Sequence, residues 1–295
     1  MPEFCHIENI AAACSGCVRI QAQAAALLGR DEDAGRYAEL AGAIRQAFHA
    51  KFFDPAKRHY DRGSQCANAL ALAMDLAPPE HRQGVLDSLV TDIDKRGGRL
   101  STGIIGTDAL ARALPALGRA DVMYRIATQT DFPSWGYGVV HGQTTIAEDF
   151  ECSHRHSVSM KMFGSVEKFF YRDLAGIRLV EPGYWRFDIQ PQVVGDLTHV
   201  RASLATVRGL IAVEWRREAG SLAVNVTVPA NTTATIHLPK LGWQRVAVTE
   251  SGRLIVGAGQ CEQVAGISAA MQTDTHVVLG VGSGAYSFLL LPESF

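Results

Sequence analysis

The sequence predicts an α+β protein in which a helical domain of successive hairpins precedes an antiparallel β-sandwich. Up to about residue 177, apolar residues recur at three- and four-residue intervals, the spacing of amphipathic helices. Beyond Gly176, apolar and polar residues alternate, with Gly, Pro and Asn turns about every ten residues. The length of 295 residues suits two ordinary domains. We therefore expect a helical domain over 1–177 and a β-sandwich over 178–295.

The helical part is expected to contain helices of ordinary length joined by turns, in an all-α layer such as a helical toroid. Gly29 is a plausible end for the first helix, and Asp33 a plausible N-cap for the second. Loops are expected over 52–65 and 97–107. The helices are expected over Ile7–Leu28, from Asp33 through Phe48, Cys66–Leu76, Glu80–Lys95, Asp108–Leu117, Ala120–Thr128, a short one starting near Thr144, and Ser157–Ala175.

The β-sandwich is predicted from short runs with a period of two. Trp185, Phe187 and Ile189 alternate with polar neighbours, and 222–228 continues the pattern. Several such runs, separated by regular turns, are typical of an antiparallel sandwich.

Composition excludes several classes of partner. The formal net charge is −2 with no long basic run, so neither nucleic acid nor an anionic membrane is expected. No apolar segment reaches the roughly 18 residues of a membrane-spanning helix. The N-terminus lacks the pattern of a secretory signal, so a cytoplasmic location is the expectation. Only Cys14 and Cys17 form a C-x-x-C, which we interpret as small residues at a helix contact rather than a metal site. No cofactor is expected.

The stretch from Asp131 to Ile177 concentrates the residues that carry chemistry. It contains the rings of Trp135 and Tyr137 among glycines, which suit the apolar faces of a sugar. Carboxylates and imidazoles follow. On residue chemistry alone, the acidic group is best interpreted as a solvated face, and histidines at i and i+2 do not share a helical face, so no metal is expected. The acidic group is Glu148, Asp149 and Glu151, and the histidines are His154 and His156.

Several motifs in this order resemble the α-L-rhamnosidases of glycoside hydrolase family 78, from about residue 35 onward. The helical motifs are GRLSTGIIGT (98–107), TQTDFPSWGY (128–137), GQTTIAE (142–148) and MFGSVEKFFYRDLAGI (162–177). The motifs PGYWRFDIQPQ (182–192) and VTVPANTTATIHL (226–238) resemble the C-terminal β-domain of that family.

The resemblance implies an (α/α)6 barrel followed by a β-sandwich, and inverting hydrolysis of terminal α-L-rhamnosides. The glutamate that ends the G-x-T-T-x-x-E motif, Glu148 here, would act as the general base. His156 or His154 would contact the sugar, with Trp135, Tyr137 and Asp149 shaping its site. An inverting enzyme uses this carboxylate to activate water and a second carboxyl group to protonate the leaving oxygen. The expected partner is a rhamnose-containing glycoside.

The chain also departs from the family pattern. Ala147 stands where the family usually has Trp, and the segment that holds the general acid of the family has no counterpart. Asp108, Glu80 and Asp149 are conceivable acids without the right sequence context. Only the later part of a barrel is expected, an incomplete toroid that would self-associate or need a complementary N-terminal portion. The alternatives are a non-catalytic sugar-binding or interaction protein derived from a rhamnosidase and, third, another (α/α)6 hydrolase or lyase.

Overall fold

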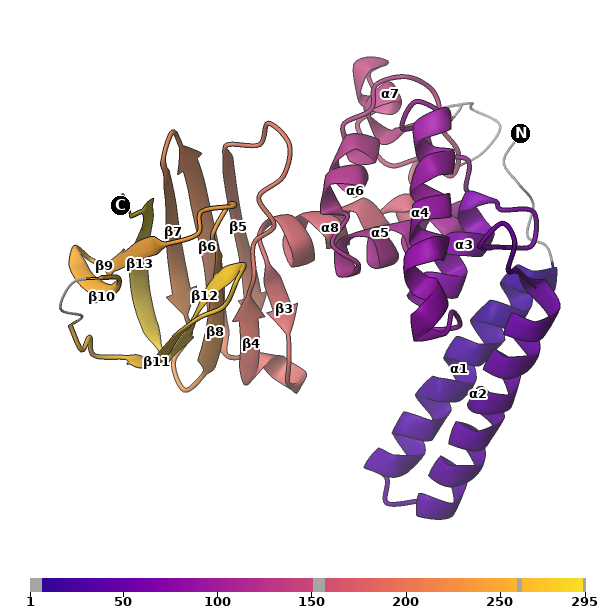
Figure 1. Cartoon of the computed structure of the whole chain (residues 1–295), viewed down its shortest axis with the longest axis horizontal. Coiled ribbons are helices and arrows are strands. Elements are labelled where there is room, and N and C mark those ends of the chain that lie inside the picture. The colour runs from indigo at the N-terminus through magenta and orange to yellow at the C-terminus, as the bar shows by residue number, and fades with distance from the viewer. Residues whose placement is uncertain (1–6, 151–156, 259–261, 294–295) are drawn as a thin grey trace. The chain divides into compact units, whose positions relative to one another are not determined.

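The computed structural model describes residues 7–150, 157–258 and 262–293, with side chains from residue 15 onward. The chain forms two compact units, 1–166 and 167–295 (Figure 1). Helices precede strands, as predicted. The position of the boundary near residue 178 stays a prediction; the second unit includes the end of the last helix, whose Leu174 carbonyl accepts a hydrogen bond from Trp215.

Several helices of the first unit begin or end at ordinary capping signals. Ser64 caps α3, where its Oγ accepts the backbone N–H of Ala67 at 3.1 Å. Pro79 occupies the first turn of α4, and Gly29 follows α1 with φ +67°. The helices are α1 (Ile7–Leu27), α2 (Asp31–Phe52), α3 (Gln65–Ala73), α4 (Pro79–Lys95), α5 (Ile104–Ala116), α6 (Ala120–Ala127), α7 (Trp135–Val140) and α8 (Ser165–Phe169).

The core of this unit surrounds α3, whose residues from Gln65 to Ala71 are all buried. α3 packs against α4 and α5, and the apolar stripe of α4 faces inward as its periodicity predicts. By contrast, α1 and α2 form a long hairpin that extends away from the other helices (Figure 1). Large apolar side chains remain exposed on it, including Leu27 (88%) and Ile20 (63%). Among the described residues, none of the helices combines the length and apolar character needed to span a bilayer.

Several local expectations are wrong. Asp33 lies in the first turn of α2, whose N-cap is Arg30. The expected 97–107 loop ends early, because α5 begins at Ile104. The 52–65 loop contains a short hairpin of β1 (Phe53–Asp54) and β2 (His59–Tyr60). No helix starts near Thr144, where the main chain of 146–148 instead forms hydrogen bonds with 157–160. The last helix begins later than expected, as the 3₁₀ turn η1 (Lys161–Phe163), and ends in the π-helical turn η2 (Phe170–Leu174).

The second unit is a sandwich of two sheets, of strand order β10-β9-β13-β7-β6-β5 and β11-β12-β8-β4-β3. The strand pairs of both sheets are antiparallel except β4 with β8, which is parallel. The 3₁₀ turn η3 is Pro182–Tyr184, and the strands are β3 (Ile177–Leu179), β4 (Arg186–Ile189), β5 (His199–Thr206), β6 (Gly209–Glu218), β7 (Ser221–Val228), β8 (Thr233–Pro239), β9 (Val246–Glu250), β10 (Arg253–Val256), β11 (Ile267–Gln272), β12 (His276–Val281) and β13 (Gly284–Pro292).

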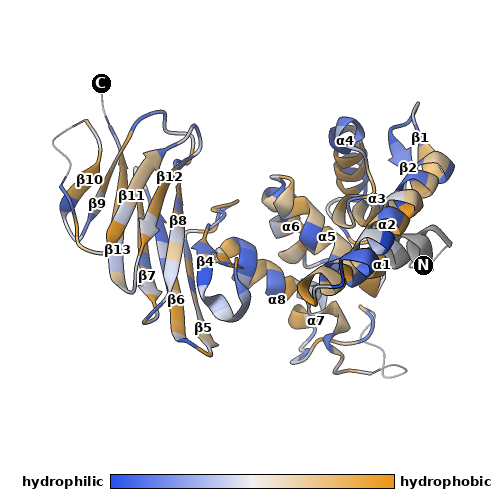
Figure 2. Ribbon diagram, turned by 90° about the horizontal axis from the view of Figure 1, so that it is seen from below, coloured by the Kyte–Doolittle hydropathy of each residue, from blue (hydrophilic) through white to orange (hydrophobic). Residues whose placement is uncertain are grey.

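The sandwich core follows from alternation along the strands. On β7, every second residue from Leu222 to Val228 is buried, and hydrophobic and hydrophilic residues alternate along the strands (Figure 2). Trp215 on β6 is fully buried, and its indole N–H donates to the carbonyl of Leu174 at 2.8 Å. A buried indole needs such a partner.

Candidate active site

The candidate site begins at α7, a six-residue helix that carries both sugar-site rings predicted from the sequence. Ser134, 1% exposed, caps it, since its Oγ accepts the backbone N–H of Tyr137 at 2.9 Å. The Phe132–Pro133 peptide bond before the helix is cis. Trp135 and Tyr137 therefore extend from a capped helix.

The two glycines of α7 are there for close packing and not for flexibility. A Cβ on Gly136 would collide with the main-chain carbonyl group of Gln129. A Cβ on Gly138 would meet the side-chain amide of Gln143. Neither glycine has a positive φ, so small size is the property that the structure uses.

Trp135 is held at both its polar edge and its ring. Its Nε1–H donates to the carbonyl of Phe163 at 3.0 Å. Its ring meets Phe150 edge to face, with centroids 5.7 Å apart, and Phe150 in turn packs on Phe163 at 4.6 Å. We call Trp135, Phe150 and Phe163 the aromatic cluster. This cluster joins α7 to the segment that follows Glu148.

Tyr137 lies beside two further rings. Phe132 contacts it edge to face at 5.5 Å, and the imidazole of His141 lies 4.0 Å from it. The Nδ1 of His141 also lies 2.8 Å from the Tyr137 carbonyl oxygen, one turn back along the chain. Phe132 and His141 were not among the site residues predicted from the sequence.

Glu148 lies on one side of a short antiparallel pairing between 145–148 and 157–160. Its backbone N–H donates to the carbonyl of Ser157 at 2.8 Å, and the backbone N–H of Met160 donates to Ile146. The Thr145 hydroxyl donates to the carbonyl of Val158. The Oε2 of Glu148 accepts the backbone N–H of Ser157 at 3.2 Å. A carboxylate held in this way has a restricted set of orientations while its other oxygen remains available for a further partner.

The structure thus brings Trp135 near the segment of Glu148, since Phe150 is two residues beyond it. Asp149 is half-buried in the same segment. His154, His156 and Glu151 lie outside the described residues. Ala147 is buried, at 7% exposure.

Two of the conceivable acids, Asp108 and Glu80, lie on different helices, and the third, Asp149, directly follows Glu148 outside any helix. Asp108 lies on α5 and pairs with Arg112 one turn on, with N–O at 2.9 Å. Glu80 lies in the first turn of α4. Within the part of the chain that the structure describes, no group of three or more His, Cys, Asp or Glu side chains is arranged to bind a metal ion.

Comparison with known proteins assigns both units. Residues 6–174 match the bacterial alpha-L-rhamnosidase 6 hairpin glycosidase domain, and 176–253 match the bacterial alpha-L-rhamnosidase C-terminal domain. An alpha-L-rhamnosidase of Streptomyces avermitilis is 31% identical over 278 residues, which is 91% of this chain and 25% of that protein. One from Formosa agariphila is 31% identical over 230 residues, 75% of this chain and 25% of that protein.

Solved structures agree. The alpha-L-rhamnosidase of Dictyoglumus thermophilum superposes with a TM-score of 0.86 at 33% identity, covering 94% of this chain and 31% of that one. The Streptomyces avermitilis enzyme, complexed with L-rhamnose, gives a TM-score of 0.81 at 29% identity, covering 95% and 26%. The chain spans about a quarter of the length of the curated relatives it matches. The resemblance drawn from the motifs is confirmed: this chain belongs to the bacterial alpha-L-rhamnosidase family of six-hairpin glycosidases, with its C-terminal β-domain.

Proposed function

We propose that this chain provides part of the catalytic site of an α-L-rhamnosidase-type glycoside hydrolase, with a rhamnose-containing glycoside as substrate and Glu148 as general base. The observation that carries the proposal is the Glu148–Ser157 pairing beside the aromatic cluster. It places an oriented carboxylate in the same segment as a ring that contacts Trp135. A relative of the same family has been solved with L-rhamnose.

The chemistry assigned to Glu148 is removal of a proton from the attacking water. In an inverting hydrolysis this water approaches the face of the sugar opposite the leaving group, while a separate acid protonates the leaving oxygen. Trp135 and Tyr137 offer apolar ring surface to the sugar, and Asp149, His154 and His156 are the proposed polar contacts. Glu148, as the base, is the one catalytic residue proposed.

The second candidate is a sugar-binding protein without hydrolysis. Buried Ala147 favours it, because a small side chain stands beside the proposed base where the family motif usually has Trp. Such a protein would bind rhamnose without hydrolysing the glycoside.

Hydrolysis of an aryl α-L-rhamnoside by this chain, beside Glu148→Gln, tests both candidates. The side-chain amide oxygen introduced by this substitution can still accept the Ser157 N–H, so the variant removes the base and keeps the pairing. Loss of activity by roughly 10²–10⁴-fold supports general-base catalysis. Unchanged turnover refutes it. Rhamnose binding without turnover in either protein supports the binding candidate, and absence of both binding and turnover refutes the sugar site in this chain.

We also propose that the α1–α2 hairpin is covered in the working protein, either by complementary helices or by a second copy. Exposed Ile20, Leu27, Leu28 and Leu40 support this, since soluble proteins rarely leave large apolar side chains grouped on one element. Light scattering of this chain at micromolar concentration should show self-association. A monodisperse monomer would count against the second-copy form.

A further inference from the structure

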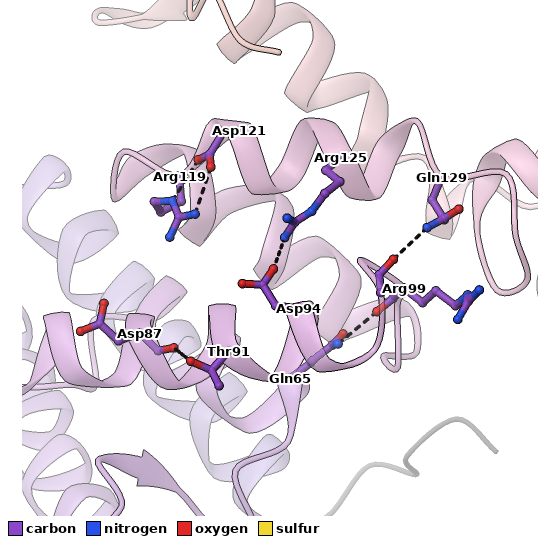
Figure 3. Close-up of polar contacts among 10 residues, drawn as sticks. Gln65, Asp87, Thr91, Asp94, Arg99, Arg119, Asp121, Arg125 and Gln129 are labelled. Atoms are coloured by element: carbon purple, nitrogen blue, oxygen red, sulfur yellow. Dashed lines mark hydrogen bonds and ion pairs between the residues drawn. The ribbon is translucent and has the colours of Figure 1, made fainter. Parts of the chain in front are cut away.

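Gln129, the second residue after α6, connects two loops through its side chain (Figure 3). Its Nε2–H donates to the carbonyl of Gly97 in the α4–α5 loop at 3.0 Å. Its Oε1 accepts the backbone N–H groups of Thr130 and Asp131 at 3.0 and 3.1 Å. One half-buried amide therefore orders both its own loop and the loop opposite.

The loop opposite Gln129 is anchored to the core. The buried side chain of Gln65 on α3 donates to the carbonyl of Arg99 at 3.1 Å and accepts the backbone N–H of Ser101 at 2.9 Å. Figure 3 shows both contacts, the Gln65 amide at the Arg99 carbonyl and the Gln129 amide at the Gly97 carbonyl. Arg99 also forms an ion pair with Asp131 across the two loops. The Gly97 carbonyl is thus a fixed point for the Gln129 amide.

On its other side, Gln129 supports α7. The Cα of Gly136 lies so near the Gln129 carbonyl group that a Cβ would collide with it. Gly136 directly follows Trp135, whose indole is fixed at its far edge by Phe163. The first turn of α7 therefore packs directly against the Gln129 main chain. The hydrogen bonds of the Gln129 side chain hold that main chain in place.

We propose that Gln129 is a positioning residue for Trp135 in the sugar site. The inference rests on the proposed function, in which Trp135 offers its ring to rhamnose. The three hydrogen bonds of the Gln129 amide join the core-anchored α4–α5 loop to the start of α7. Their removal lets the loop and the first turn of α7 shift, while the fold, carried by buried apolar contacts elsewhere, remains.

The test uses Gln129→Met, which keeps length and removes all three hydrogen bonds, and Gln129→Glu, which keeps the acceptor for Thr130 and Asp131 but loses the donor to Gly97. Gln83→Met is the matched control, because Gln83 bonds only Asp87 among the described contacts, on the surface of α4. L-rhamnose affinity is measured by titration calorimetry. Exposure of Trp135 is measured by iodide quenching, as the difference between each protein and its Trp135→Phe counterpart.

Gln129→Met should weaken rhamnose binding by roughly 10- to 100-fold and make Trp135 more accessible to iodide, with circular dichroism unchanged. Gln129→Glu should give an intermediate loss, and Gln83→Met should match the parent. If Gln129→Met does not fold, Gln129→Glu decides alone. Parent protein that fails to bind rhamnose overturns the proposed function, whereas unchanged Trp135 quenching in the folded variant overturns the role of Gln129.

Discussion

Gly136→Ala is a sharp test of the packing that places α7. A Cβ at this position would lie 3.1 Å from the carbonyl carbon of Gln129 and closer still to its oxygen. It would also lie 3.4 Å from the Cα of Thr130. These are main-chain atoms, so relief requires the α6–α7 loop or α7 itself to shift, rather than a side chain to rotate.

The sign of the effect comes from two opposed contributions. Helix propensity favours alanine over glycine by about 0.8–1.0 kcal/mol. Forcing an extra carbon into a well-packed site costs about 1–3 kcal/mol, and contact with the main chain favours the upper end. The expected net destabilisation is about 2 kcal/mol. For a unit of this size, that corresponds to a decrease in Tm of about 4–8 °C.

Gly42→Ala supplies the matched control. Gly42 lies inside α2, and a Cβ there meets nothing within 4 Å. Only the propensity contribution remains, so the variant should be more stable by about 1 kcal/mol. Thermal unfolding followed by circular dichroism measures both. A Tm that rises in Gly136→Ala as it does in Gly42→Ala would refute the close contact between α7 and the Gln129 carbonyl.

Two further predictions concern the sandwich. Trp215→Phe should destabilise the second unit by roughly 2–4 kcal/mol in denaturant unfolding, because it leaves a cavity and an unpaired Leu174 carbonyl. Trp185 is half-exposed, so Trp185→Phe should cost less than about 1 kcal/mol. Equal losses of stability in the two variants would contradict the burial of Trp215. Burial lowers the pKa of His237 and of His276 in the folded protein below the ordinary 6.5. Just below pH 6.5 the unfolded chain therefore binds more protons than the folded protein, and the free energy of unfolding should fall as the pH falls. The double variant His237→Asn/His276→Asn should flatten this slope in Tm measured against pH, and an unchanged slope would assign it to other groups.

Local patterning was sufficient to predict most of the elements. The helices α1 to α6 follow from apolar spacing and from terminating residues such as Gly29, since both act within a few neighbouring residues. The alternation along β7 identifies the buried face of a strand in the same way. Several motifs in the family's order, including the one that ends at Glu148, were enough to identify the family. α7 was missed because Gly136 and Gly138 lower helix propensity, and their reason for being there is contact with residues outside the helix.

The sequence by itself therefore determined the order of helices and strands and their buried faces, whereas Glu148 as base is what the family resemblance implies. The tertiary structure alone decided which segments meet: 145–148 with 157–160, β4 parallel to β8, and Gln129 with Gly97. The physical reason is the range of the interactions. Periodicity and capping involve residues within a turn or two of each other. The contacts above join more distant residues, and many arrangements of those residues are compatible with the same local pattern. Packing selects one of them.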